Sequence, residues 1–242
     1  MTSLLAQVQA PEIDYLGLAP LFATIGGTIV VLLVSLLRGA FVQRMLVPYL
    51  AAMSLLVAMG LTMANWEPGD TAPIVEGALA IDTLALFLSM IFYLAGLVTV
   101  VLALRSDMLR EAGSGEAMAL LLGSITGMVV LAGAENLVTL FVGLELLSIP
   151  LYVLCASEVR RSRSLEAGLK YLVIGSVGSA VLLYGLALIY GATGSTDFAL
   201  ISEAIGASVG IGDPLLLTGI ALVATGLAFK ASVAPFHQWA PW

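Results

Sequence analysis

Long apolar stretches recur along the whole chain, separated by short segments that carry most of the charged residues. Five of these stretches contain no charged residue and two are each interrupted by one. A helix needs about 18 or more apolar residues to cross the hydrocarbon core of a bilayer, and each stretch reaches that length. The sequence therefore predicts seven membrane-spanning helices: Tyr15–Leu37, Met45–Trp66, Thr83–Leu104, Ala117–Ala134, Asn136–Ser157, Tyr171–Thr196 and Pro214–Val233.

Composition supports this interpretation and excludes several classes of protein. Of the 242 residues 60% are hydrophobic and 10% are charged, and the mean hydropathy of +1.09 is too high for a soluble domain that must cover its core. No segment between the predicted spans is long enough for a folded domain outside the bilayer. A net charge of −7 argues against nucleic-acid binding. The predicted fold class is an all-α polytopic membrane helix bundle in contact with lipid.

The basic residues predict the orientation of the bundle. Eight of the nine follow the first, third and fifth spans, whereas the segments after the second and sixth spans carry acids only. By the positive-inside rule the N-terminus lies outside. The first twenty residues contain no Lys or Arg, so we expect no cleaved signal peptide and a first span that remains in the mature protein. The eight residues are Arg38, Arg44, Arg105, Arg110, Arg160, Arg161, Arg163 and Lys170.

Two charged residues fall inside predicted spans. Glu145 lies nine residues after Asn136, about 14 Å along a helix and near the middle of the bilayer. Lys230 lies sixteen residues after Pro214, about 24 Å along its helix and in the inner half. A charge at such depth is costly unless it is hydrated, paired or neutralised. Glu145 and Lys230 are therefore the strongest site candidates.

A proline follows each of these charges after five residues, Pro150 after Glu145 and Pro235 after Lys230. Because proline has no N–H for the carbonyl four residues back, each charge is predicted to lie beside a helix break that water can reach. We expect the seventh helix to be broken near Lys230. Broken helices around an ion site at mid-membrane are a recurring feature of transporters.

The opposite charges suggest a proton relay. A neighbouring carboxylate stabilises the ammonium form of a lysine inside a membrane, whereas desolvation favours the neutral amine, so moving the partner would switch Lys230 between holding and releasing a proton. The alternatives are a static ion pair, or side chains that extend to an interface, which is open to Lys230 but implausible for the short Glu145 side chain at mid-depth.

Two further residues have open interpretations. Lys170, at the inner mouth of the sixth span, is either an interfacial anchor or a member of the relay. His237, the only histidine, follows Lys230 by seven residues with Pro235 between them, and is either a proton carrier or an anchor beside Phe236 and Trp239.

Motifs for other chemistry are missing from the sequence. It contains no glycine-rich dinucleotide fingerprint after a strand, no Walker sequence and no cluster of metal ligands. The single Cys155 excludes an intrachain disulfide and a four-cysteine cluster. We therefore expect no cofactor on this chain, and any redox chemistry or nucleotide hydrolysis on partner subunits.

Three segments in order, Asn136–Tyr152, Ser164–Tyr171 and Gly226–Pro241, resemble the antiporter-like membrane subunits of respiratory complex I. The resemblance implies a proton-translocating membrane-arm subunit of an NADH-quinone oxidoreductase, with NADH, FMN, iron–sulfur clusters and quinone bound by partner subunits in a prokaryotic inner membrane. It matches the family's buried glutamate and lysine with Glu145 and Lys230. The family's other relay positions match Lys170 and His237.

The family usually has about fourteen helices arranged as two inverted repeats. With seven predicted spans, this chain is expected to correspond to the N-terminal half of such a subunit. Residues 1–115 would form a three-helix membrane segment and residues 116–242 the first part of the repeat. Two alternatives remain: a subunit of a multi-subunit sodium/proton antiporter or membrane-bound hydrogenase, and a structural membrane subunit that does not pump.

Overall fold

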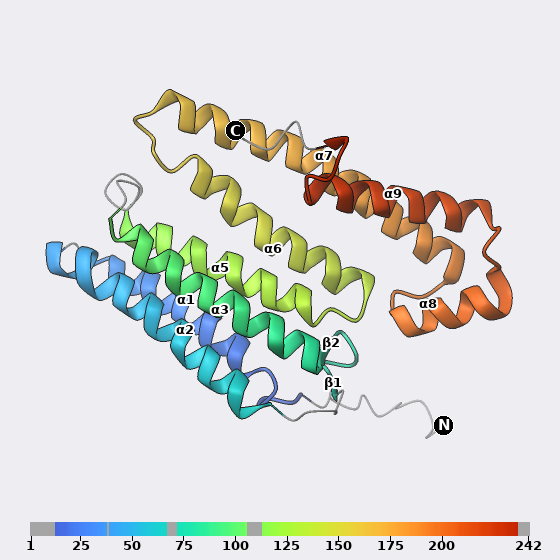
Figure 1. Cartoon of the computed structure of the whole chain (residues 1–242), viewed down its shortest axis with the longest axis horizontal. Helices are drawn as coiled ribbons and strands as arrows, with labels where there is room; N and C mark the ends of the chain where they lie inside the picture. Colours follow the sequence, from blue (N-terminus) through green and yellow to red (C-terminus); the bar gives the residue numbers. More distant parts are fainter. Residues whose placement is uncertain (1–12, 38, 67–71, 106–112, 237–242) are drawn as a thin grey trace, which may run out of the picture.

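The computed structural model describes residues 13–37, 39–66, 72–105 and 113–236. A long helix occupies each of the seven predicted spans, which confirms the all-α membrane bundle (Figure 1). These helices are α1 (Ala19–Ser35), α2 (Val47–Ala64), α3 (Thr83–Ala103), α5 (Ser114–Ala132), α6 (Leu137–Cys155), α7 (Ser162–Thr193) and α9 (Pro214–Lys230).

Five of the helices are long and apolar enough to cross a membrane: α3, α5, α6, α7, and α2 together with the π-helical turn η1 (Val42–Leu46) that leads into it. Helices α1 and α9 are apolar and have 17 residues each, at the lower end of the ~17–25 residues seen in spanning helices. The chain is a multi-pass integral membrane protein.

The helices form two groups that meet between α5 and α6 (Figure 1). Buried apolar side chains of α1, α2, α3 and α5 form one core, here called the N-terminal core, which includes Leu55, Tyr93 and Leu122. A second cluster, the C-terminal core, joins α6, α7 and α9 around Leu182 and Leu216. Helix α5 thus shares its core with the preceding helices. The division at residue 115 stays a prediction.

Short elements at one end of the bundle were not predicted. The hairpin of β1 (Ala72–Ile74) and β2 (Leu79–Ile81) pairs antiparallel, with Pro73 opposite Ala80. The Ala80 N–H donates to the Gly133 carbonyl after α5 at 2.8 Å, and the Leu137 N–H donates to the Thr196 carbonyl after α7 at 2.8 Å. These bonds connect the loops at this end. Between α7 and α9 lie α8 (Phe198–Ala204) and the π-helical turn η2 (Ile205–Val209).

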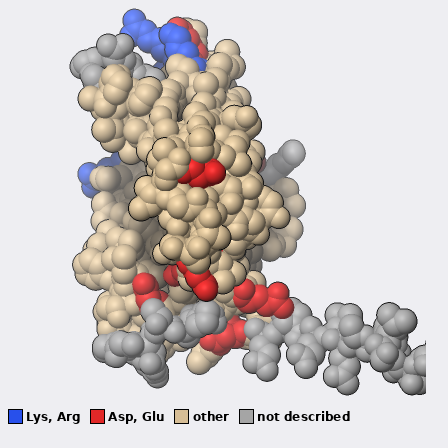
Figure 2. Space-filling model, turned by 90° about the vertical axis from the view of Figure 1, so that its right-hand side faces the viewer, with Lys and Arg blue, Asp and Glu red and all other residues tan. Residues whose placement is uncertain are grey.

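The two ends of the bundle differ in charge. Figure 2 looks onto the end with the hairpin and α8, and acidic side chains are spread over this face while Lys and Arg lie at its margins. Three of the acids, Asp82, Asp197 and Asp213, cap the N-termini of α3, α8 and α9, each accepting a backbone hydrogen bond. The opposite end, called the basic end, carries Arg44, Arg105, Arg160, Arg161, Arg163 and Lys170. The outside position of the N-terminus stays a prediction.

The two prolines behave differently. Pro150 does not break α6, which continues to Cys155, so the predicted break at this residue is wrong. Its ring is buried and faces Gly123 of α5, and packing against neighbouring helices holds the helix together despite the lost hydrogen bond. Helix α9 ends at Lys230, as predicted, and Pro235 lies in the turns that follow.

Candidate functional site

The two charges inside the bundle form an ion pair. Glu145 is the ninth of the 19 residues of α6, and Lys230 is the last residue of α9. The Lys230 Nζ lies 2.8 Å from the Glu145 Oε1, and the exposed fractions of the two side chains are 12% and 22%. The pairing suggested by the sequence is therefore present, between residues that are 85 positions apart.

Two hydroxyl groups complete the surroundings of the lysine. The Lys230 Nζ lies 3.0 Å from the Ser148 Oγ and 3.4 Å from the Tyr152 hydroxyl oxygen. The Tyr152 ring centroid is 5.9 Å from the same nitrogen, within reach of a cation–π contact. An ammonium group has three hydrogens to donate, and here three oxygens, on Glu145, Ser148 and Tyr152, accept them. The geometry fits a charged Lys230.

The carboxylate has a second partner on α7. The Ser179 Oγ lies 2.6 Å from the Glu145 Oε1 and 3.0 Å from the Gly175 carbonyl oxygen. The hydroxyl has one hydrogen, so it donates to only one of them at a time. Ser179 therefore has an alternative acceptor if the Glu145 side chain moves.

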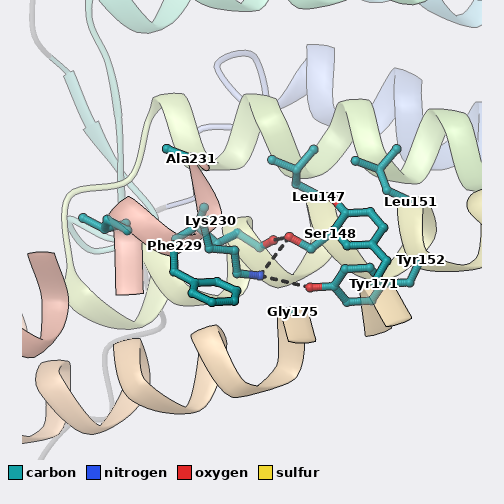
Figure 3. A pocket seen from close by; sticks show the side chains of 11 residues that line it. Leu147, Ser148, Leu151, Tyr152, Tyr171, Gly175, Phe229, Lys230 and Ala231 are labelled. Atoms are coloured by element: carbon teal, nitrogen blue, oxygen red, sulfur yellow. Dashed lines mark hydrogen bonds between the residues drawn. The ribbon is translucent and has the colours of Figure 1, made fainter. Parts of the chain in front are cut away.

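A pocket of about 310 Å³ lies between α6, α7 and α9 beside this pair. Its lining includes Lys230, Ser148 and Tyr152, whose polar atoms point toward one another (Figure 3). On α6 the lining runs from Leu144 to Tyr152, in the half of the helix nearer the basic end. On α7 it includes Tyr171, the tenth residue of a helix that begins in the basic loop. The pocket thus extends from the lysine toward the basic end.

Three residues of the site were missed by the sequence reasoning, namely Ser148, Tyr152 and Ser179. A signal for two of them exists, because Ser148 and Tyr152 follow Glu145 by three and seven residues and so share its helix face. Ser179 stands in a run of small residues that is typical of ordinary helix packing in membranes. Only the arrangement of α6 against α7 distinguishes it.

The remaining predicted site residues lie apart from the pair. Lys170 pairs with Glu166 four residues earlier on α7, and the two side chains are 67% and 62% exposed. Lys170 is not among the described residues that line the pocket. His237 lies outside the residues that the structure describes. In the described ranges, no three His, Cys, Asp or Glu side chains are grouped so that they could hold a metal ion.

Comparison with known proteins agrees with this architecture. Residues 134–242 match the family model described as "NADH:quinone oxidoreductase/Mrp antiporter, TM". The chain is 40% identical to NADH-quinone oxidoreductase subunit N of Chloroflexus aggregans over 236 residues, which are 96% of this chain and 47% of that protein. It is 39% identical to NAD(P)H-quinone oxidoreductase subunit 2 of Synechocystis, covering 88% of this chain and 41% of that one. The chain spans about half the length of the curated relatives it matches.

Solved structures show the same likeness. A chain of respiratory complex I from Thermus thermophilus superposes with a TM-score of 0.70 at 34% identity, covering 90% of this chain and 46% of that one. A chain of the archaeal membrane-bound sulfane sulfur reductase has the same fold, with a TM-score of 0.80 at 21% identity and coverage of 94% and 47%. These findings confirm the predicted resemblance to the antiporter-like membrane subunits. Within that class, the chain is similar to subunit N of bacterial NADH-quinone oxidoreductases.

Proposed function

We propose that this chain forms the part of a proton-translocating subunit that corresponds to the first half of subunit N, in a multi-subunit NADH-quinone oxidoreductase of a prokaryotic inner membrane. NADH oxidation and quinone reduction, with their FMN and iron–sulfur clusters, would take place on other subunits. The observation that carries the proposal is the Lys230–Glu145 pair at 2.8 Å in the interior of the bundle. The similarity to subunit N supports it.

The pair provides a way to couple motion to proton transfer. With Glu145 at 2.8 Å the charged amine of Lys230 is stabilised by an opposite charge, and this attraction is strong in surroundings of low dielectric constant. If Glu145 moves away, the charged amine loses this stabilisation and its proton leaves. Ser179 assists such a motion, because its hydroxyl can turn from Glu145 to the Gly175 carbonyl.

The pocket provides access for water. Its volume of about 310 Å³ is room for several water molecules. Because it extends from Lys230 toward the basic end, the predicted inner side, the proposed direction of proton uptake is from inside. Lys170, which lies at that end, is proposed as a residue near the mouth of this path, and His237, which follows Lys230 by seven residues in the sequence, as a further proton carrier.

The experiment is Glu145→Gln in the complex of native membranes. NADH-driven proton uptake by inside-out vesicles is compared with NADH oxidation and with the amount of assembled complex. We expect assembly to persist and proton uptake to fall by about 100-fold, the scale of losing a positioned proton-transfer group. Glu135→Gln is the matched control, since Glu135 lies on the connection between α5 and α6 outside the helices. Unchanged proton uptake in Glu145→Gln would contradict the proposal.

The alternative is a cation/proton antiporter subunit, because the matching family model also includes the Mrp antiporters. The same vesicles distinguish the two functions. Sodium-dependent proton exchange without NADH supports the antiporter, whereas uptake that needs NADH and is indifferent to sodium supports the oxidoreductase. A purely structural subunit is supported only if Glu145→Gln prevents assembly.

A further inference from the structure

The lysine has one face toward its carboxylate partner and another toward the pocket. Lys230, Ser148 and Tyr152 line the pocket, but Glu145 is not among the described residues that do so. Water that enters the pocket would therefore meet the amine and the two hydroxyl groups without passing the carboxylate. The route that delivers a proton to Lys230 and the group that stabilises it there are different.

The two hydroxyls are not equivalent. Ser148 lies 2.6 Å from the Leu144 carbonyl oxygen, to which it donates its only hydrogen, as helical serines often do. Its remaining capacity is to accept from Lys230 at 3.0 Å. The Tyr152 hydroxyl can both accept and donate, and the residue is 4% exposed. Tyr152 is therefore the group suited to pass a proton on.

The fold holds the Tyr152 ring in this position from two sides. The Tyr171 ring contacts it edge-on, with centroids 4.6 Å apart and an interplanar angle of 80°. On α7, Gly175 leaves room for the hydroxyl, because a Cβ at that residue would lie 2.4 Å from the Tyr152 hydroxyl oxygen. A side chain of any size at residue 175 would displace the hydroxyl. Gly175 therefore contributes to the site as well as to helix packing.

We propose that the Tyr152 hydroxyl transfers protons between water in the pocket and Lys230, with Gly175 positioning it. The proposal rests on the proposed function and adds a residue to its path. In the loading step the neutral amine of Lys230 takes the hydroxyl hydrogen of Tyr152, and the phenolic oxygen takes a proton from a hydronium ion in the pocket in the same event. The phenolic O–H bond and one O–H bond of the hydronium ion break, while an N–H bond on Lys230 and a new phenolic O–H bond form. Tyr152 ends neutral, the hydronium ion becomes water, and one proton has moved to the lysine.

Tyr152→Phe tests the proposal in the native complex. It removes the hydroxyl and keeps the ring contact with Tyr171, so we expect normal assembly and NADH-driven proton uptake about 100-fold lower. Tyr93→Phe is the matched control, because Tyr93 is also a fully buried tyrosine but belongs to the N-terminal core. Equal proton uptake in Tyr152→Phe and Tyr93→Phe, with both complexes assembled, would overturn the proposal.

Gly175→Ala provides a second, independent variant. It should displace the Tyr152 hydroxyl and lower proton uptake, while Gly191→Ala on the same helix, whose added methyl meets Leu215 at an ordinary 3.6 Å, should not. If Gly175→Ala acts through the hydroxyl, it causes no further loss in the Tyr152→Phe background. Additive losses would mean that Gly175 acts by packing alone and would overturn its positioning role.

The proposed function and this inference fail separately. If Glu145→Gln abolishes proton uptake and Tyr152→Phe does not change it, the relay through Tyr152 is wrong and the proposed function stands. If neither variant changes uptake, the proposed function itself is wrong. In D₂O, proton uptake by the unaltered complex should be slower than in H₂O. If this difference is absent in Tyr152→Phe, transfer through the Tyr152 hydroxyl limits the rate of uptake.

Discussion

The N-terminal and C-terminal cores are both built from buried apolar side chains but differ in what lies beside them. The N-terminal core is closed by apolar side chains such as Val31, Leu55 and Leu122, which are fully buried, and its adjacent pocket measures about 50 Å³. Beside the C-terminal core lie an ion pair and a pocket of about 310 Å³.

Polar groups show the same contrast. In the N-terminal group, Ser54 donates to the Ala23 carbonyl and Thr126 lies 3.0 Å from the Thr24 hydroxyl, which joins helices to one another. In the C-terminal group, Ser148 and Ser179 contact the charged pair. Small polar residues in this bundle thus either connect neighbouring helices or contact the charged pair, and the presence of a charged neighbour distinguishes the two roles.

The strongest break in this contrast is Lys230→Met, which removes the cation of the C-terminal group and leaves Glu145 without its partner. Methionine fills similar space but cannot hold a proton, so we expect proton uptake to fall by about 100-fold or more. The measurement is NADH-driven uptake in inside-out vesicles. Lys230→Arg is the control for charge: it keeps a cation beside Glu145 but does not release its proton. Equal uptake in Lys230→Met and the unaltered complex would refute the relay.

The second prediction concerns the boundary where the two groups meet. A Cβ at Gly127 of α5 would lie 2.3 Å from the Leu147 backbone nitrogen of α6, whereas one at Gly123 would find its nearest neighbour at 3.8 Å. Gly127→Ala should therefore separate the helices and destabilise the subunit by about 1–3 kcal/mol, the usual cost of overpacking.

The midpoint of thermal unfolding in detergent measures this effect, with Gly123→Ala as the control on the same helix face. The two glycines were recognised in the sequence only as a small-residue pair for packing. Equal midpoints for the two variants would show that α5 and α6 can shift apart without cost, and that the two groups are not rigidly joined.

Most of the fold could be predicted, because a bilayer leaves the chain few options. Backbone groups inside lipid must be paired within a helix, so the apolar stretches located all seven long helices. The hairpin from Ala72 to Ile81 and helix α8 were missed because they lie outside the apolar stretches, where the pairing of loops depends on tertiary contacts.

The candidate site could be predicted only in part. Glu145 and Lys230 stand out because charge inside an apolar stretch is costly. Pro150 was misjudged, since its effect depends on what packs against α6. Tyr152 and Ser179 are ordinary residues for a membrane helix. Their position beside the pair depends on how α7 and α9 pack against α6, and the spacing of residues in the sequence does not reveal this packing.

The smallest effect is expected for Lys170→Gln. Lys170 pairs with Glu166, both side chains are more than half exposed, and the pair lies at the basic end rather than at the site. An exposed ion pair contributes little. If Lys170 only assists water at the mouth of the path, its loss should slow NADH-driven uptake by no more than about threefold, far less than the loss of a group that itself transfers the proton. Glu166→Gln, which frees the same lysine, is the control and should leave uptake unchanged. A loss in Lys170→Gln as large as that in Lys230→Met would place Lys170 within the relay and move the site toward the basic end.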